Sequence, residues 1–327
     1  MSLLIIRAAE IRELLSMAEC IEVMDRAMRA VTARSVTIPP RTIAPLADER
    51  SFFILMPGEM QSPPMYGAKI VGLHPDNPDK GRPAVQGFVA LFDSRTGNPV
   101  ALADGAEITA IRTAAASALA TRVLARPHAS SHGILGTGVQ AASHLDAVCC
   151  VRNIRSVRVW GRDPEKARRF AAQHAARLDM SITAVTDPAE AGACDVVSVV
   201  TNAPEPVLAG SWLQPGAHVN LVGAHEPQDR EADTEAVTRS AVYVDSRTGA
   251  LAEAGDILIP IAEGAFTRDH IVGEIGDVLL GSAPGREDPQ QITLYKSLGL
   301  FAQDLFACGF LLEKAVKAGK CQTVEFP

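Results

Sequence analysis

The chain has no excess of positive charge, and this absence narrows the possible classes of partner. Its 327 residues include 31 Lys and Arg against 38 Asp and Glu, which gives a formal net charge of −7 at pH 7. A chain with this balance is not expected to take nucleic acid or an anionic membrane as its principal partner. Any anionic ligand must therefore be bound by a few placed cations, not by a general positive field.

Paired cysteines, metal-ligand clusters and long apolar segments are also missing from the sequence. The six cysteines form no CxxC pair, and no group of His, Cys and acidic residues has the spacing of metal ligands. No apolar run approaches the ~20 residues of a membrane span. The opening MSLLIIRAAEIRELL lacks the apolar core of a signal peptide. We therefore expect no disulfide, no metal and a cytoplasmic location.

The chain is long enough for two domains, and its first third predicts an α+β domain. Ser16 and Glu19 have the spacing of a capping box, and apolar residues recur after them at helical spacing, so we expect an amphipathic helix over 17–33. Short strand-like runs follow a break at Pro39 and Pro40. They cover 51–56, 66–73 and 85–93, and a turn over 94–98 leads the last of them into 99–103 as a hairpin.

From about residue 105 the pattern changes to alternating helices and strands. Residues 107–125 predict an alanine-rich helix, and Asp163-Pro164 predicts an N-cap with proline at the first position of a helix ending near Leu178. The strand-like runs are 133–135, 157–160, 181–185, 196–200, 217–222 and 241–244. This alternation predicts an α/β fold with a doubly wound, parallel Rossmann sheet. A final helix over about 294–317 is expected to pack back onto the first domain.

A glycine-rich turn marks the expected nucleotide site. Residues 136–141 read Gly-Thr-Gly-Val-Gln-Ala and fit the pattern G-x-G-x-x-A. Alone this string is weak, but here it follows an apolar strand, precedes a helix, and has a second strand about twenty residues on, as a dinucleotide site requires. The helix N-terminus would supply N–H donors to the pyrophosphate. The cofactor-binding candidates from this turn are Gly136, Gly138, Val139, Gln140 and Ala141.

The end of the second strand of this unit bears on which cofactor binds. An acidic side chain there would accept hydrogen bonds from the ribose hydroxyls of NAD, whereas this chain has Gly161 and Arg162. An arginine can contact a 2′-phosphate, so NADP(H) is favoured and NAD(H) stays possible. Alternatively, Arg162 is a solvated surface residue and Asp163 only caps the next helix.

Three cations outside the glycine turn stand in unusual surroundings. Arg41 follows Pro39-Pro40, Lys69 lies in an otherwise apolar strand, and Arg112 lies among small residues of a helix. Taken alone, each is more often a surface or salt-bridged residue, since long basic side chains reach out from apolar faces.

These residues lie in segments that resemble the ornithine cyclodeaminase/mu-crystallin family. The segments are GAKIVGLHPDNPDKGRP (67–83), DGAEITAIRTAAASALA (104–120), GILGTGVQA (133–141) and ITLYKSLGLFAQDL (292–305), in the family's order. The resemblance implies a homodimer in which the first domain's sheet joins that of its partner. Residues 1–112 with 300–327 would form the substrate-binding and dimerisation domain, and residues 113–299 the Rossmann domain.

The resemblance also implies roles for individual residues. Arg41, Lys69 and Arg112 match the cations that hold the substrate carboxylate, and an arginine can grip a carboxylate bidentately while a lysine adds a point charge. Arg112 and Thr113 would also approach the cofactor phosphates, and Leu298 would contact the substrate. The remaining cofactor contacts would be Thr201, Val222 and Ser297.

Three departures separate this chain from true ornithine cyclodeaminases and favour the ketimine reductase/mu-crystallin branch. His225, Ile54 and Lys296 stand where cyclodeaminases resemble one another in having acids. A pocket for ornithine should keep carboxylates, whereas a ketimine without a distal ammonium does not need them. The expected function is NAD(P)H-dependent reduction of small cyclic α-imino acids, such as Δ1-pyrroline-2-carboxylate to proline. The alternatives are an ornithine cyclodeaminase, or a non-catalytic NADPH-dependent protein that binds a ligand as mu-crystallins do.

The proton donor to the imine nitrogen stays open at this point. His225 is one candidate, because the pKa of histidine lies near working pH. It could equally be a histidine hydrogen-bonded within a loop, in which case Lys69 or water would deliver the proton.

Overall fold

The computed structural model describes residues 2–48, 50–319 and 321–325. The chain divides into two compact units, Met1–Thr113 with Leu300–Pro327 and Ala114–Gly299. The helix α3 (Gly105–Leu124) begins in the first unit and continues into the second.

The first unit is built on a mostly antiparallel sheet of order β16-β1-β7-β6-β5-β4-β2, with β3 paired to β4. β4, β5, β6 and β7 form a meander, and β1 joins it parallel to β7. The strands expected over 66–73, 85–93 and 99–103 are confirmed, and the one expected over 51–56 extends further. The strands are β1 (Ser2–Ile6), β2 (Val36–Thr37), β3 (Thr42–Pro45), β4 (Phe52–Gln61), β5 (Pro64–Leu73), β6 (Val85–Asp93), β7 (Pro99–Asp104) and β16 (Gln322–Glu325).

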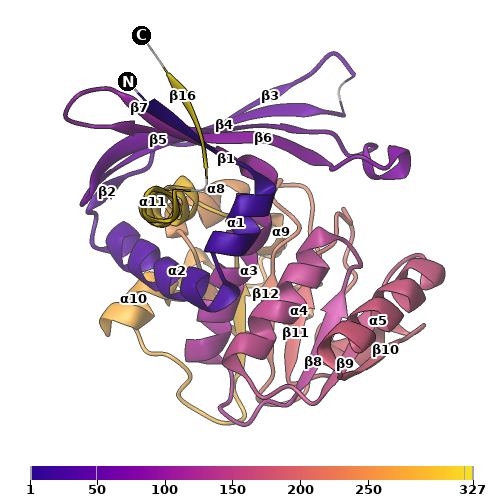
Figure 1. The fold of residues 1–327 in the computed structure, drawn as a ribbon. Coiled ribbons are helices and arrows are strands. Elements are labelled where there is room, and N and C mark those ends of the chain that lie inside the picture. The colour runs from indigo at the N-terminus through magenta and orange to yellow at the C-terminus, as the bar shows by residue number, and fades with distance from the viewer. Residues whose placement is uncertain (1, 49, 320, 326–327) are drawn as a thin grey trace. The chain divides into compact units, whose positions relative to one another are not determined.

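Helices cover one face of this sheet. The predicted helix α2 (Met17–Thr32) is confirmed, capped by Ser16 and Glu19 in a reciprocal capping box. It packs beside α11 (Phe301–Ala318), which also contacts β4, β5 and β6 (Figure 1). The short helices α1 (Ala8–Leu14) and η1 (Pro78–Lys80) complete the first unit.

The second unit contains the predicted doubly wound sheet. Its strands are all parallel, in the order β10-β9-β8-β11-β12-β15-β13-β14, so the winding reverses between β8 and β11. Asp163 caps α5 with Pro164 at the first position, as expected. The strands are β8 (Ser131–Leu135), β9 (Ser156–Trp160), β10 (Ser181–Ala184), β11 (Val196–Val199), β12 (His218–Leu221), β13 (Ser240–Val244), β14 (Ile271–Glu274) and β15 (Ile292–Lys296).

Helices and short turns connect these strands. The helices are α4 (Val139–Val151), α5 (Pro164–Leu178), α6 (Pro188–Gly192), α7 (Thr234–Thr238), α8 (Arg247–Glu253), α9 (Gly255–Ala262) and α10 (Ile275–Leu280), with 3₁₀ turns η2 (Gly210–Trp212) and η3 (Arg268–His270). The sequence patterns did not predict the helices after β12 individually.

The start predicted for the last helix is wrong. Residues 294–296 belong to β15, which lies between β12 and β13 and is buried along its length. Gly299 then adopts φ +81°, a left-handed conformation that interrupts the chain before α11 begins at Phe301. A buried parallel strand is apolar on both faces, so its residues lack the alternation that separates a strand from a helix. The predicted packing of α11 within the first unit is confirmed.

Candidate active site

The predicted nucleotide residues of the second unit lie at one edge of its sheet. Because the strands are parallel, the loops after their carboxyl ends emerge on the same side, which is where open α/β sheets bind ligands. Residues 136–141 follow β8, and Arg162 follows β9. Thr201 follows β11, Val222 and His225 follow β12, and Ser297 and Leu298 follow β15.

The glycine turn after β8 has the geometry of a pyrophosphate site. Gly136 adopts φ +128°, and a Cβ there would lie 2.9 Å from the Val200 carbonyl oxygen. Gly138 is the N-cap of α4 and no side chain caps this helix, while a Cβ at Gly138 would meet nothing within 4 Å. Val139, in the first turn, is 68% exposed. An uncapped helix N-terminus with open space before it offers N–H donors to an anion.

Two predicted cofactor residues carry buried hydroxyl groups whose hydrogen bonds are unmade. Thr113 Oγ1 and Ser297 Oγ have no hydrogen-bond partner within the part of the chain that the structure describes. A buried polar atom left in this state costs about 1–3 kcal/mol. Both hydroxyls are therefore suited to hydrogen-bond a ligand. Within the second unit, the Ser297 hydroxyl and the open glycine turn fit a dinucleotide.

The first unit brings two of the predicted substrate cations together at a carboxylate that sequence reasoning missed. Lys69 on β5 donates from Nζ to both carboxylate oxygens of Asp304 on α11, at 3.0 and 3.1 Å. Arg112 on α3 donates from Nε to Asp304 Oδ1 at 3.2 Å and from Nη1 to Gln303 Oε1 at 2.7 Å. Lys69 is 3% exposed, Arg112 4% and Asp304 0%. This cation cluster, Lys69 and Arg112 around Asp304, is therefore almost completely desolvated.

The pKa of Lys69 is lowered from 10.5 to about 8. Burial is the largest cause, the positive charges of Arg112 and Arg41 act in the same direction, and Asp304 opposes them. Arg41, the third predicted cation, directly precedes β3 and is close enough to Lys69 for its charge to be felt. Burial thus brings Lys69 within reach of proton exchange near working pH.

The second unit contains a different buried charge network, formed by Lys296, Asp256 and Glu231. Lys296 Nζ donates to Asp256 Oδ2 at 2.8 Å and to the Ala224 carbonyl at 2.5 Å. Lys296 is thus fully buried in an ion pair. Its role here is therefore more than the replacement of an acid that cyclodeaminases have at this position. Asp256 Oδ1 accepts from the backbone N–H of Glu231 and of Ala232.

Glu231 joins two of the loops that carry predicted cofactor residues. Its Oε1 accepts from the backbone N–H and the hydroxyl of Thr201, both at 2.7 Å, and its Oε2 accepts from the backbone N–H of Gly223 and Ala224. In the same way Asp245, at the end of β13, accepts from the N–H groups of Leu298 and Gly299 at 2.8 and 2.7 Å. Buried carboxylates therefore fix the loops at this edge of the sheet.

His225 is half-buried in the loop after β12. Its Nδ1 lies 2.9 Å from the Gly223 carbonyl oxygen. Because a carbonyl only accepts, Nδ1 must carry the proton, and Nε2 is left to exchange a proton with another group. The hydrogen bond shows how the loop orients the ring, and both earlier interpretations of His225 are compatible with it.

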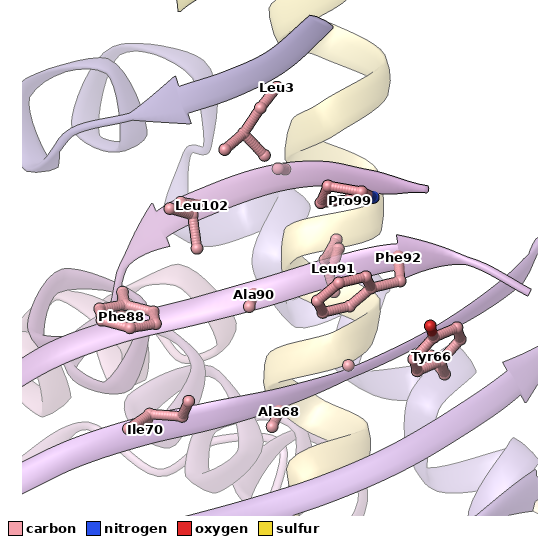
Figure 2. Close-up of a pocket in the computed structure, with 12 residues that line it drawn as sticks. Leu3, Tyr66, Ala68, Ile70, Phe88, Ala90, Leu91, Phe92, Pro99 and Leu102 are labelled. Atoms are coloured by element: carbon pink, nitrogen blue, oxygen red, sulfur yellow. The ribbon is translucent and has the colours of Figure 1, made fainter. Parts of the chain in front are cut away.

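A separate apolar pocket lies on the sheet of the first unit. Figure 2 shows Tyr66, Phe88 and Phe92 projecting from β5 and β6, with Leu102 of β7 and Leu3 of β1 beside them. Ala68 and Ile70 line this pocket on either side of Lys69, whose side chain points to the opposite face and reaches α11. No charged side chain lines the pocket, so it does not contain the cation cluster.

Over residues 2–48, 50–319 and 321–325, no group of three or more His, Cys, Asp and Glu side chains is arranged to hold a metal ion. No helix within those ranges combines the length and apolar character needed to cross a membrane.

The sheet order, the open glycine turn and the loops at the carboxyl edge define a Rossmann-type enzyme that uses a nicotinamide cofactor. The chain belongs to the ornithine cyclodeaminase/mu-crystallin family, which it matches over residues 2–319. The family predicted from the four segments is thereby confirmed.

Relatives of this chain include named reductases. It is 36% identical over 326 residues to the Δ1-pyrroline-2-carboxylate reductase of Bacillus cereus, covering 99% of this chain and 100% of the relative. The solved structure of Thermococcus litoralis Δ1-pyrroline-2-carboxylate reductase, in complex with NADH and L-proline, is 38% identical with a TM-score of 0.95, covering 98% and 100% of the two chains. An archaeal alanine dehydrogenase dimer with bound NAD is 29% identical with a TM-score of 0.93, and each chain is fully covered.

Proposed function

We propose that this protein is an NAD(P)H-dependent reductase of small cyclic α-imino acids, converting Δ1-pyrroline-2-carboxylate or a close analogue to the cyclic amino acid. The observation that carries the proposal is the buried cation cluster, in which Lys69 and Arg112 share the single carboxylate of Asp304. Two desolvated cations at one acid leave positive charge that a substrate carboxylate can neutralise. The reductase names of the full-length relatives support the reaction class.

The residues of this chain divide the work of the reaction. The bound cofactor supplies the hydride that reduces the C=N bond. Arg41, Lys69 and Arg112 hold the substrate carboxylate, which fixes the orientation of the imine carbon. A proton reaches the ring nitrogen from Lys69 or from Nε2 of His225, since the Gly223 carbonyl keeps the His225 Nδ1 proton in place.

On the cofactor side, the glycine turn and the α4 N-terminus would bind the pyrophosphate. The dinucleotide would also hydrogen-bond the buried hydroxyls of Thr113 and Ser297, which have no partner among the described residues. Thr201 and Val222 are held beside it by their loops, the first through Glu231 and the second through its N–H bond to the Val199 carbonyl.

One assay separates this proposal from the two alternatives. A reductase oxidises NADPH or NADH when Δ1-pyrroline-2-carboxylate is added. An ornithine cyclodeaminase converts ornithine to proline without net NADH production, because the cofactor is regenerated within each turnover. A non-catalytic binding protein does neither. Ornithine turnover without imine reduction, or no turnover of either compound, would contradict the proposal.

NADPH is the preferred cofactor in this proposal. Arg162 is exposed directly after β9, and the neighbouring acid, Asp163, is engaged by its hydrogen bonds to the backbone of α5. The acid is thus not offered to a ribose, while the guanidinium is available to a 2′-phosphate. NADPH should bind more tightly than NADH, and Arg162→Asp should reverse that order in fluorescence titrations. Arg155→Asp, at the opposite end of β9, is the matched control and should leave the order unchanged. Equal affinities in the unmutated protein would remove the argument.

The protein is also proposed to be a homodimer that covers the apolar pocket of the first unit. Phe88 and Tyr66, which line this pocket, are 41% and 38% exposed, and the similar archaeal alanine dehydrogenase is a dimer. Contiguous exposed apolar patches of this kind mark interfaces. Light scattering should give twice the chain mass, and Phe88→Glu should weaken the dimer. Val316→Glu, at an exposed position of α11, should not. A monomer at micromolar concentration would contradict the assembly.

A further inference from the structure

The carboxylate of Asp304 binds the same two cations, Lys69 and Arg112, that the proposed function assigns to the substrate carboxylate. Both of its carboxylate oxygens accept from Lys69 Nζ, and Oδ1 also accepts from Arg112 Nε. Its side chain is completely buried on the face of α11 that packs against the sheet. Nothing in the expected chemistry of imine reduction requires an acid beside the carboxylate-binding cations, so Asp304 calls for a reason.

The charges around Lys69 suggest that reason. The groups that act on its ammonium are Arg112 from α3, Arg41 from the segment before β3, and Asp304 from α11. Cys308, one turn after Asp304, feels the charge of Lys69, but burial raises the pKa of its thiol and keeps it neutral. Among the described residues whose charges act on Lys69, Asp304 is therefore the anion, and it opposes the cations Arg112 and Arg41.

We propose that Asp304 is a positioning residue of the carboxylate site, which holds Lys69 and Arg112 at one point and keeps Lys69 in its ammonium form so that it can bind the substrate carboxylate. This inference rests on the proposed reductase function. Lys69 and Arg112 with the one carboxylate of Asp304 retain a net charge of about +1, so the substrate carboxylate adds to Asp304 and does not need to displace it.

The energetic basis is the balance between burial and charge at Lys69. Burial, Arg112 and Arg41 lower the pKa of Lys69, to about 8, and Asp304 alone among its neighbours raises it. Loss of the Asp304 charge must therefore lower the pKa further. Each unit of decrease reduces the ammonium fraction about tenfold at pH values above both pKa values. A neutral amine would then stand where a cation is needed.

The experiment compares pH profiles of kcat/KM for Δ1-pyrroline-2-carboxylate. In the unmutated enzyme, kcat/KM should be highest below the pKa of Lys69 and should fall as pH rises through about 8. In Asp304→Asn this loss should begin at lower pH, so the deficit against the unmutated enzyme grows with pH to about tenfold or more. Asp304→Glu keeps the charge, so the pH at which kcat/KM is lost should return towards that of the unmutated enzyme.

Gln303→Leu is the matched control. It removes the neutral hydrogen bond from Arg112 Nη1 at the adjacent position of α11, and leaves the charge beside Lys69 intact. In Gln303→Leu, kcat/KM should fall by the same factor at every pH. The pH at which kcat/KM begins to be lost should not shift. A flat, pH-independent deficit in Asp304→Asn, like that of Gln303→Leu, would overturn the inference and leave Asp304 a merely structural residue.

A second readout does not depend on turnover. The Lys69 side-chain signal, assigned with Lys69→Ala in lysine-labelled protein, can be titrated by NMR in the absence of substrate. The pKa of Lys69 should be lower in Asp304→Asn than in the unmutated protein, and an unchanged value would overturn the inference. If Asp304→Asn does not fold, Asp304→Ser leaves room for water beside Lys69.

The two readouts also separate this inference from the proposed function. If the unmutated protein fails to reduce the imino acid while the NMR shift is observed, the proposed function is wrong and the link between Asp304 and Lys69 stands. If reduction is observed and the Lys69 pKa does not respond to Asp304, the reverse holds.

Discussion

The two buried charge groups of this protein, one in each unit, have opposite balance. The cation cluster of the first unit sets Lys69 and Arg112, with Arg41 nearby, against the single acid Asp304. The network of the second unit sets one cation, Lys296, against the two acids Asp256 and Glu231. Both are fully or almost fully removed from water. The sign of the surplus charge therefore distinguishes them, not their burial.

The way in which the surplus is satisfied shows what each group is for. In the second unit the extra negative charge is taken up internally, since backbone N–H groups of Thr201, Gly223 and Ala224 donate to Glu231. In the first unit, the one carboxylate of Asp304 serves both Lys69 and Arg112. A buried charge needs a partner. We infer that the network is structural support for cofactor loops, whereas the cation cluster is completed by its substrate.

The largest expected difference between the two groups is in stability. Lys296→Met should lower the free energy of unfolding by about 3–5 kcal/mol, because it leaves a buried carboxylate without its cation. Lys69→Met should cost less, since it removes one of several cations and Arg112 still pairs with Asp304. Urea denaturation of both variants under one condition makes the comparison. An equal or larger loss in Lys69→Met would show that the first cluster is as closely balanced as the second.

The next largest expected effect is on catalysis by the cation cluster of the first unit. Lys69→Ala and Arg112→Ala should each lower kcat/KM for an α-imino acid about ten- to a hundredfold, since a charge-assisted bond to a desolvated carboxylate is worth about 1.5–3 kcal/mol. NADPH affinity should survive Lys69→Ala, because Lys69 is on β5 of the first unit, whereas it should weaken in Arg112→Ala if Arg112 also contacts the cofactor phosphates.

A decarboxylated cyclic imine is the control substrate for that experiment. It has no carboxylate to bind, so Lys69→Ala should scarcely change its slow reduction. If Lys69→Ala slows both substrates equally, with fold and NADPH affinity intact, Lys69 donates the proton and does not anchor the carboxylate. Steady-state kinetics with the two imines settle which role is correct.

Parts of the fold and site that depend on neighbouring residues could be predicted from the sequence. The glycine turn at 136–141 and the Asp163-Pro164 cap are local signals, because the required backbone conformation and the residues that permit it are adjacent. Lys69 attracted attention for the same reason, as a charge at an inward position of an apolar strand. The pattern around Lys69 still left a surface or salt-bridged residue as an alternative.

The partners of those residues could not be predicted in the same way. Asp304 lies 235 positions from Lys69. The sequence indicated its role only by placing an acidic residue in the apolar stripe of α11. Glu231 and Asp256 stand in short helices and loops without strong periodicity, and their roles come from backbone N–H groups that any residue type supplies. The strand β15 was mistaken for helix because burial on both faces removed its alternation. Long-range packing decided all three.

The smallest expected effect concerns the pH dependence of the second network. Burial raises the pKa of Glu231 from 4.5 to about 7, with Asp256 adding to the shift and Lys296 opposing it. An acid whose folded-state pKa is raised binds a proton in the folded state that the unfolded chain has lost, so its contribution to stability falls as pH rises from about 4.5 towards 7.

Glu231→Gln mimics the protonated form of Glu231, so the stability of the variant lacks this dependence on pH. At pH values well below 7 the variant should differ from the unmutated protein by no more than about 1–3 kcal/mol, the cost of imperfect hydrogen bonds. Above 7 the difference should shrink, because only the unmutated protein must then bury an ionised side chain. Urea unfolding on both sides of neutral pH measures this. A difference that grows with pH would mean that the N–H donors of Thr201, Gly223 and Ala224 hold Glu231 ionised throughout, so that the second network carries its surplus of negative charge at every pH and not only above about 7.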